Sequence, residues 1–418
     1  LMKNDVIFLD KFHATSEMNS LLEQTLREGA RLLLQQAIEN EVNEYLESMK
    51  GRRDFEGRKQ FVRNGYLPER EVQTGIGPIS VKQPRIRNRE ESSEGYSSAI
   101  LPKYLRRVPS LDAVIPALYL RGISTSNFQD ALEAIMGKDA KGLSAANITR
   151  LKQSWEQEYK DWNKRSLEGK RYAYIWVDGI YFNVRLGDDR ICFLVILGAL
   201  PNGKKELVAI HNGYRESKIS WTEVLESLKR RGLCTAPELA IGDGALGFWS
   251  AIEEVFPKTK QQRCWVHKTA NVLDKMPKSI QVNAKKAIHE IYMAPTKEDG
   301  LAAFEVFLKT YRDKYPKACA CLEKDKAQLF TFYNFPAIHW QHVRTTNPIE
   351  STFATIRHRT RQTKGCGSVA ATLTMVFKLA TTAEKKWRKL KGCEMIEKVI
   401  NGVVFKDGEE VLEKEKVA

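Results

Sequence analysis

The sequence predicts a multidomain α+β protein, because the spacing of its apolar residues changes several times along 418 residues. Residues 1–50 repeat apolar side chains at helical spacing, residues 51–108 alternate in short runs, and a strand-rich segment begins near Tyr172. A hydrophobic fraction of 42% is ordinary for a globular protein and argues against a disordered or fibrous chain. At about 100–200 residues per domain, this length predicts two to four domains.

The positive charge of the chain is unevenly distributed. The formal net charge is +15 overall, −5 over residues 1–49, +7 over residues 50–107 and +6 over residues 344–418. This excess favours nucleic acid as a partner. The longest apolar run, Ile191 to Leu200, is about half as long as a membrane-spanning helix, and no secretory signal is recognisable, so we expect no membrane association. Seven cysteines without framework spacing indicate reduced thiols in a cytoplasmic setting.

The first 50 residues predict a long amphipathic helix. Apolar side chains recur at three- and four-residue steps from Leu21 to Leu46. Little sequence precedes this helix to cover it, so we expect it to pair with a second copy of the chain in a homodimer. Packing against its own core is an equally good interpretation.

Residues 51–108 predict a basic β-hairpin region. Alternating apolar residues on either side of a turn at 75–78, such as Val72 and Ile79, indicate two antiparallel strands. Basic side chains in this region suit contacts with DNA phosphates, although solvated surface charge would look the same. The candidates for DNA contact are Lys82, Arg85, Arg87, Arg106 and Arg107.

Residues 109–165 have the outline of a helix-turn-helix unit. Two helical patterns end at Gly122 and Gly137, and a third begins after Ser144, a favourable N-cap. Three-helix units are also common in proteins that never touch DNA. In a DNA-binding unit the third helix would present polar side chains to base edges and phosphates. These side chains are Asn147, Thr149, Arg150, Lys152 and Gln153.

The segment at residues 166–270 predicts elements in the order β-β-β-α-β-α. Aromatic and β-branched runs mark the strands and helical spacing marks the helices. The expected strands are 172–185, 191–200, 205–211 and 239–241, and the expected helices are 218–230 and 245–256. This is the order of the ribonuclease-H-like fold, in which a mixed sheet carries carboxylates in the middle of its first strand and at the end of its fourth.

Two aspartates occupy those positions. Asp178 lies inside the first strand and Asp243 ends the fourth. A half-buried carboxylate is costly unless it is paired, caps a helix or binds a cation. Oxygen-rich clusters without cysteine suit Mg²⁺ or Mn²⁺.

The segment Gly242–Gly247 also fits the glycine pattern of a dinucleotide-binding turn between a strand and a helix. In that interpretation, however, Asp243 would lie where a pyrophosphate must lie. No acidic residue ends a second strand about 20 positions further on. We therefore expect no nucleotide cofactor.

A third carboxylate opens a later helix. Asn347 is the expected N-cap and Pro348 the first helical residue, which makes Glu350 the third. An acid there commonly closes a capping box. Glu350 also shares a helix face with Arg357 and Arg361, which suits either metal ions beside a phosphate backbone or an intrahelical salt bridge.

Four blocks of sequence resemble mutator-type transposases of bacterial insertion sequences, and the resemblance extends across most of the chain. The blocks are Asp178-Gly179 with Arg185, Gly242-Asp243-Gly244, Arg263 to Lys268, and Thr345 to Ser351. The run from Arg344 to Gly367 is the most specific part.

The resemblance implies a DDE acidic triad of Asp178, Asp243 and Glu350 in a ribonuclease-H-like core. Two Mg²⁺ ions, or Mn²⁺ as a substitute, would be bound by these three acids. The resemblance also implies a helical insertion at 271–343, and a C-terminal segment at 344–418 with the third acid and a basic tail. Further DNA contacts would come from Arg357, Arg359, Arg361 and Lys364.

Cys264 and His267 match the Cys-x-x-His element of that family. From their spacing alone they are half a zinc site, which Cys319 and Cys321 do not convincingly complete. The resemblance implies that His267 approaches the active site or the DNA and that Cys264 is structural; a buried core histidine is the alternative. Arg185 lies seven residues after the first acid, on the opposite face of a regular strand, so a place near the metals needs a bulge or an indirect role.

The function that the resemblance implies is DNA transposition in the bacterial cytoplasm, at the nucleoid. Such enzymes bind the terminal inverted repeats of an element, cleave and join strands of double-stranded DNA including flanking and target DNA, and proceed through a circular copied intermediate. A non-catalytic DNA-binding regulator is one alternative, but it leaves Asp178 unexplained. A dinucleotide-dependent oxidoreductase is another, and it does not account for the basic segments.

Overall fold

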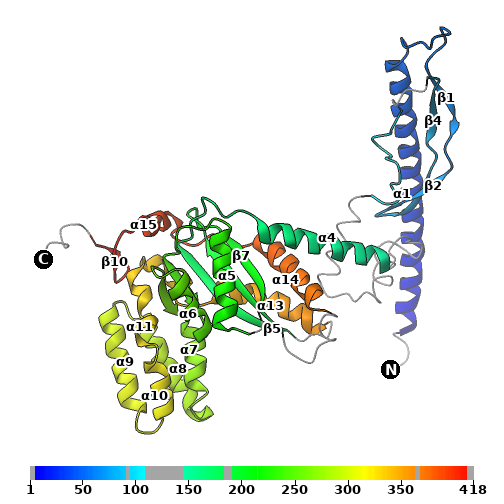
Figure 1. The fold of residues 1–418 in the computed structure, drawn as a ribbon. Helices are drawn as coiled ribbons and strands as arrows, with labels where there is room; N and C mark the ends of the chain where they lie inside the picture. Colours follow the sequence, from blue (N-terminus) through cyan, green and yellow to red (C-terminus); the bar gives the residue numbers. More distant parts are fainter. Residues whose placement is uncertain are drawn as a thin grey trace. The chain divides into compact units, whose positions relative to one another are not determined.

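The computed structural model describes residues 5–90, 95–108, 145–182, 191–213, 215–362 and 368–411. The chain forms two compact units, Leu1–Leu151 and Lys152–Ala418. The mixture of helices and sheets (Figure 1) confirms the predicted multidomain α+β class. Within the described segments, no helix combines the length and the apolar character that crossing a membrane requires.

In the first unit a long helix packs against antiparallel strands. The elements are helix α1 (Asp5–Ser48) and strands β1 (Phe61–Tyr66), β2 (Arg70–Thr74), β3 (Gly77–Val81) and β4 (Pro84–Asn88). Strands β2 and β3 form the predicted hairpin, and β1 pairs with β4. Gly77 has a φ of +103°, a backbone conformation that favours glycine at this turn. Helix and hairpin share an apolar cluster of Ile38, Val72, Ile79, Val81 and Leu101.

The burial of α1 changes along its length. Ile38 and Val42 are fully buried, as expected for a helix that packs on its own core. The leucines of the preceding turns are 51–70% exposed: Leu21, Leu22, Leu26, Leu32 and Leu33. The self-packing interpretation therefore holds for the last third of the helix, around Ile38 and Val42, and pairing with a second copy stays a prediction for the exposed leucines before it.

Helix α4 spans Ala145–Lys164 and begins directly after Ser144, as predicted. The two helices predicted before it fall within residues 109–144, outside the described residues. From Lys152 onward α4 belongs to the second unit, where it packs on helix α14 (Val369–Glu384). The rings of Tyr159 and Trp162 contact Phe377 of α14.

The second unit is built on a five-stranded sheet with strand order β7-β6-β5-β8-β9. Strands β5, β6 and β7 are antiparallel, whereas β8 and β9 run parallel to β5. The elements are β5 (Tyr174–Phe182), β6 (Ile191–Ala199), β7 (Lys205–Gly213), α5 (Lys218–Arg230), β8 (Leu239–Gly242), α6 (Leu246–Val255) and β9 (Lys260–Arg263). The predicted β-β-β-α-β-α order is therefore correct.

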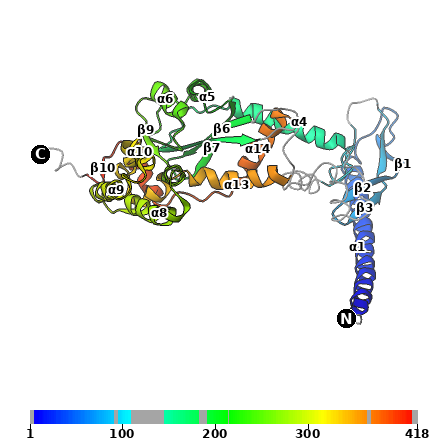
Figure 2. The ribbon, with the colours of Figure 1, turned by 90° about the horizontal axis from the view of Figure 1, so that it is seen from below.

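Helices cover both faces of this sheet (Figure 2). Helices α5 and α6 bury one face through an apolar cluster that includes Val177, Leu194 and Trp221. On the other face the Trp176 indole donates to the carbonyl of His342 in helix α12 (Trp340–Val343) at 2.9 Å. Helix α13 (Asn347–Gln362) packs on β5 on this second face.

Helices fill the chain between β9 and α13, as predicted for residues 271–343. They are α7 (Trp265–Leu273), α8 (Lys278–Met293), α9 (Lys297–Tyr311), α10 (Pro316–Glu323) and α11 (Lys326–Leu329), followed by short 3-10 turns and α12. After α14 the described residues form helix α15 (Ile396–Ile400) and a small hairpin of β10 (Phe405–Lys406) and β11 (Glu409–Glu410).

Candidate active site

Strand β5 carries Asp178 on the face of the sheet that α12 and α13 cover. Because side chains alternate along a strand, Asp178 shares this face with Trp176, whereas Val177 points into the apolar cluster beneath α5 and α6. The Asp178 side chain is only 7% exposed and, among the described residues, accepts no hydrogen bond and forms no ion pair. Burial, and next the Asp243 carboxylate, raise the pKa of Asp178 to about 7.

Strand β8 brings the second acid beside the first. The parallel register pairs Trp176 with Ile241, so Asp178 and Asp243 follow at the same level on neighbouring strands. The backbone N–H of Ala245 donates to Asp243 Oδ1 at 3.0 Å, which orients this carboxylate in the turn before α6.

The glycines of the segment 242–247 have a packing explanation. Gly244 has a φ of +93°, and a Cβ there would lie 2.1 Å from the Arg263 guanidinium. A Cβ at Gly247 would lie 2.2 Å from the backbone oxygen of Glu216. Both glycines let protein groups approach closely, so the pattern is accounted for without a nucleotide.

This turn is linked to the helical segment between the second and third acids. Arg263 pairs with Asp325, which directly precedes α11, at 3.1 Å, and Asp325 also pairs with Lys268 at 2.5 Å. The side chains of Arg263 and Lys268 are only 6% and 3% exposed. A second bond from Lys268 to the backbone oxygen of Cys321, at 2.8 Å, ties α7 to α10.

Helix α13 positions Glu350, and its start corrects one prediction. Asn347 is already inside the helix, so it is not the N-cap. The backbone oxygen of the buried Thr346 instead accepts from the N–H groups of Ile349 and Glu350, at 2.9 and 3.0 Å. Glu350 therefore closes no capping box with Asn347. Its Oε1 accepts from the hydroxyl of Thr346 at 2.7 Å, which fixes the carboxylate.

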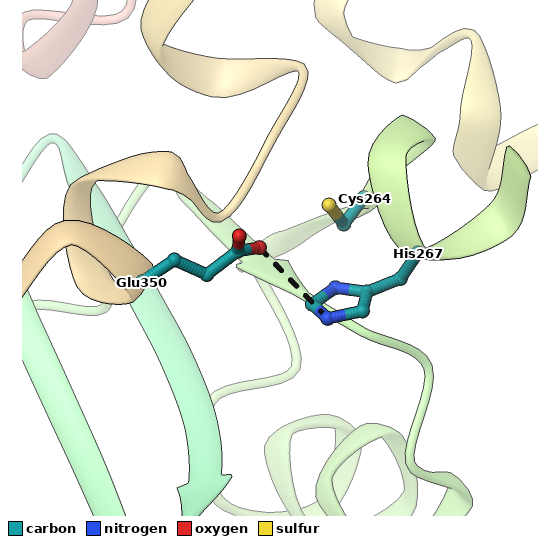
Figure 3. Close-up of side chains that lie close together, drawn as sticks. All are labelled: Cys264, His267 and Glu350. Carbon is teal, nitrogen blue, oxygen red and sulfur yellow. Dashed lines mark ion pairs between the residues drawn. The ribbon is translucent and has the colours of Figure 1, made fainter. Parts of the chain in front are cut away.

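Cys264 and His267 both lie beside Glu350 (Figure 3). His267 Nε2 is 3.8 Å from Glu350 Oε1, and the backbone N–H and the hydroxyl of Thr346 each lie 3.3 Å from Cys264 Sγ. The hydrogen bond with Cys264 raises the pKa of His267 to about 9. Burial opposes ionisation of the Cys264 thiol, but its hydrogen bond with His267 lowers the thiol pKa overall. The pair therefore favours a thiolate beside an imidazolium.

Ligand atoms of Cys264, His267 and Glu350 lie within 4.8 Å of one another, the one such group of three found in the described part of the chain. It does not include Cys319 or Cys321 on α10, in line with the expectation that these two would not complete a zinc site. A metal ion at this position would share Glu350 with the predicted acidic triad.

Glu216 is a further carboxylate near Asp243 and Asp178 that was not among the predicted site residues. It lies between β7 and α5, and its side chain covers Gly179, where a Cβ would meet the Glu216 Cδ at 2.3 Å. Burial and the carboxylates of Asp243 and Asp178 raise the pKa of Glu216 to about 7. In the sequence, Glu216 is an ordinary acidic residue before Ser217, the N-cap of α5. Only Gly179, directly after Asp178, could have indicated that another side chain approaches the strand there.

Several predicted DNA-contact residues are exposed. Arg85 and Arg87 project from the same side of β4, and Arg106 is exposed after β4. Lys82 pairs with Glu69 at 3.5 Å. Arg107 is half-buried beside β2.

In the helices, Arg150 and Gln153 of α4 and Arg357 of α13 are exposed, and Lys152 is half-buried. The remaining predicted residues or their side chains lie outside what is described: Asn147, Thr149, Arg185, Arg359, Arg361 and Lys364.

Comparison with known proteins identifies the family. The family model described as Transposase, Mutator family, matches residues 4–390. The transposase for insertion sequence element IST2 of Acidithiobacillus ferrooxidans is 52% identical over 287 residues, which are 67% of this chain and 95% of the relative. The transposase for IS6120 of Mycolicibacterium smegmatis is 51% identical over 298 residues, 71% of this chain and 92% of the relative. The transposase for ISRM5 of Rhizobium meliloti is 28% identical over 87% of this chain and 88% of the relative. By the extent of the family match and the identity to these relatives, this chain belongs to the Mutator family of transposases.

Proposed function

We propose that this chain is a DDE transposase that binds the terminal inverted repeats of an insertion sequence and catalyses metal-dependent cleavage and transfer of DNA strands. The observation that carries the proposal is the buried carboxylate of Asp178. It lies beside Asp243 and, among the described residues, accepts no hydrogen bond and forms no ion pair, and the opposing charges of His267 and Arg357 do not offset the effect of burial and Asp243 on its pKa. A carboxylate in such a place is stable when a cation binds it.

The arrangement of the core supports a ribonuclease-H-like fold. The first three strands are antiparallel and the next two are parallel to the first, with Asp178 within the first strand and Asp243 directly after the fourth. Glu350 comes from helix α13, more than a hundred residues after Asp243 in the sequence. Its charge also raises the pKa of Asp178, but less than burial and the Asp243 carboxylate do.

The donor set fits Mg²⁺, with Mn²⁺ as a substitute, because these ions prefer carboxylate oxygens. Asp178, Asp243 and Glu350 would hold two ions, which when bound activate the attacking hydroxyl and stabilise the leaving oxygen in an in-line displacement at phosphorus. The protein holds these oxygens in place through the Ala245 N–H on Asp243 and the Thr346 hydroxyl on Glu350. Water attacks in the cleavage step and a DNA 3′-hydroxyl in the joining step, so no covalent enzyme intermediate is needed.

The pathway that follows from family membership joins one strand across to the other end of the element and inserts a circular copy elsewhere. Two ends must be brought together, so a homodimer is the smallest working unit. The exposed leucines of α1, from Leu21 to Leu33, provide an apolar surface for pairing two copies.

DNA binding in the first unit is assigned to the exposed face of β4. Arg85 and Arg87 carry no ion pair with the described residues, so both charges are free for phosphates. The double variant R85Q/R87Q should bind end DNA more weakly. The slope of log binding constant against log salt concentration should decrease by about two, because about two fewer counterions are released on binding. Fluorescence anisotropy at several salt concentrations measures both. An unchanged salt slope would exclude these arginines from the DNA interface.

The catalytic proposal is tested by strand transfer with purified protein, Mg²⁺ and duplexes that carry the terminal inverted repeat. D178N and E350Q should each lower cleavage and joining by about 10³-fold or more, since bound metal supplies several kcal/mol of transition-state stabilisation. End binding should persist in both. The control is D313N, at an exposed aspartate between α9 and α10, which should cleave like the wild type. Cleavage retained by D178N or E350Q would overturn the proposal.

A further inference from the structure

The segment between α14 and α15 carries exposed basic side chains that the protein does not pair. These are Lys385, Lys386, Arg388, Lys389 and Lys391. None of these side chains forms a hydrogen bond or an ion pair with the described residues. The lysines on either side of the segment are paired instead, Lys378 with Glu158 at 2.6 Å and Lys398 with Glu410 at 2.7 Å. The unpaired charges are therefore concentrated between two paired ones.

The segment is fastened to the second unit through its backbone. The N–H of the buried Leu390 donates to the backbone oxygen of Gly203, in the turn between β6 and β7, at 2.9 Å. A Cβ at Gly203 would lie only 2.3 Å from the Cβ of Cys393, so the segment packs closely on this turn. The N–H of Lys391 donates to Nε2 of His342 in α12 at 3.2 Å. The basic side chains thus project from a backbone that is fixed at two places.

The turn itself contributes two further cations. Lys204 is exposed and Lys205 is half-buried, and neither side chain forms an ion pair with the described residues. Burial first, and then the charge of Lys205, lower the pKa of His342 to about 4, and Lys391 adds a smaller effect. The charges of Lys205 and Lys391 therefore both lie near this ring. We call residues 204, 205, 385, 386, 388, 389 and 391 the basic surface.

The acids next to the basic surface in the sequence are mostly engaged elsewhere. Glu206 pairs with Lys170 at 3.0 Å. The half-buried Glu384 accepts from the backbone N–H of Leu207 at 3.0 Å. Glu394, three residues after the last of the cations, is exposed. The basic surface therefore keeps a strong excess of positive charge.

The basic surface lies within reach of DNA bound at the acidic site. Lys205 is level with Ala199 and hence with Tyr174, four residues before Asp178 and two strands away. Strand geometry makes these offsets about 13 Å along the strand and about 10 Å across the sheet, or roughly 16 Å in all. This is about half of the 34–36 Å turn of a DNA duplex. Moreover, His342 belongs to α12, which covers the same face of the sheet as Asp178.

We propose that the basic surface binds the phosphate backbone of the DNA duplex that is cleaved at the acidic site, about half a helical turn from the cut. Charges spread over several exposed side chains suit a row of phosphates better than a single small anion. The inference rests on the DNA-binding part of the proposed function, and it adds a DNA contact in the catalytic unit to the one assigned to β4. The competing explanation is solvated charge without a partner.

The test compares the full-length triple variant K386Q/R388Q/K389Q with the wild type. The ligand is a duplex that carries the terminal inverted repeat and extends about 20 base pairs, or two helical turns, beyond the cut. In fluorescence anisotropy at about 0.1 M salt, the Kd should rise about tenfold or more, and the slope of log binding constant against log salt concentration should decrease by about two to three. The melting temperature should stay unchanged, because no ion pair is lost.

The matched control is K309Q/K314Q/K317Q, which removes the same charge from exposed lysines on and between α9 and α10 and should bind like the wild type. An unchanged salt slope in K386Q/R388Q/K389Q, or an equal decrease in the control, would overturn the inference. So would a variant that binds and cleaves the end duplex normally but joins it more slowly to a separate target duplex, since the surface would then hold the target.

D178N separates this inference from the catalytic proposal, because it leaves the basic surface intact. If D178N does not cleave and the triple variant keeps the wild-type salt slope, the basic surface is overturned and the catalytic proposal stands. If D178N cleaves like the wild type, the catalytic proposal fails, and a decreased salt slope in the triple variant alone still supports the basic surface.

Discussion

Replacing Asp178 with asparagine should stabilise the metal-free protein while it abolishes strand transfer. The carboxyl is buried next to Asp243, and burial followed by this charge raises its pKa from 3.8 to about 7. The ionised form is therefore costly in the folded protein and inexpensive in the unfolded chain. An amide has the same shape without the charge, so D178N removes that cost.

The size and sign of the effect follow from proton linkage. Below pH 3.8 the carboxyl is neutral in both states and contributes nothing. Between pH 3.8 and about 7 the unfolded chain releases its proton first, so the free energy of unfolding falls as the pH rises. Above pH 7 the cost is constant, at about 4 kcal/mol for a pKa difference of roughly three units. About 2–3 kcal/mol of it should develop between pH 5 and pH 8.

Urea unfolding in EDTA at pH 5 and pH 8 measures this difference. Tryptophan fluorescence reports on the second unit, where Trp176, Trp221 and Trp265 are buried. Between the two pH values the wild type should lose about 2–3 kcal/mol more stability than D178N does. The exposed-site variant D313N should behave like the wild type. A D178N protein that is less stable than wild type at pH 8, or that shows the same pH dependence, would refute the reasoning.

Three further substitutions test the surroundings of the third acid and of the first. In C264S the hydrogen bond that raises the His267 pKa to about 9 is weakened, so the histidine should titrate closer to its ordinary value of about 6.5 in an NMR titration; an unchanged pKa would contradict the pairing. T346V removes the hydroxyl that donates to Glu350 at 2.7 Å, a charged hydrogen bond worth about 1.5–3 kcal/mol, and should slow cleavage about tenfold or more without loss of end binding. Cleavage at the wild-type rate would show that this bond does not position the acid. G179A would place a methyl carbon 2.3 Å from the glutamate side chain above it, so thermal unfolding should reveal a loss of about 1–3 kcal/mol, and an unchanged melting temperature would mean that the glutamate can move away.

The strands of the second unit could be predicted from the sequence because their composition is unambiguous. Aromatic and β-branched residues run continuously from Tyr174 to Phe182, and the next strand, Ile191–Ala199, is almost entirely apolar. Such runs are expected of strands buried on both faces. The two aspartates stood out for the same reason, since Asp178 interrupts an apolar run and Asp243 ends one.

Long-range packing could not be predicted in the same way. The contact between Glu216 and Gly179, for example, joins two residues that are distant in sequence and carry no periodic signal. The start of α13 was placed one residue late because Asn347 is a better N-cap by side-chain type. Thr346 takes the N-cap position instead. Its hydrogen bonds with Cys264 and Glu350 hold it where its backbone oxygen accepts the first hydrogen bonds of the helix.

The paired cations Arg263 and Lys268 limit how this enzyme can be shortened by engineering. Their common partner, Asp325, comes from the helices that separate the second acid from the third. A deletion that replaced these helices with a short linker would leave two buried positive charges without a partner, at a cost of about 3–5 kcal/mol for each broken pair. It would also release the guanidinium that lies against Gly244, next to Asp243. A minimal transposase made from this chain should therefore retain Asp325, or replace Arg263 and Lys268 with apolar residues at the same time.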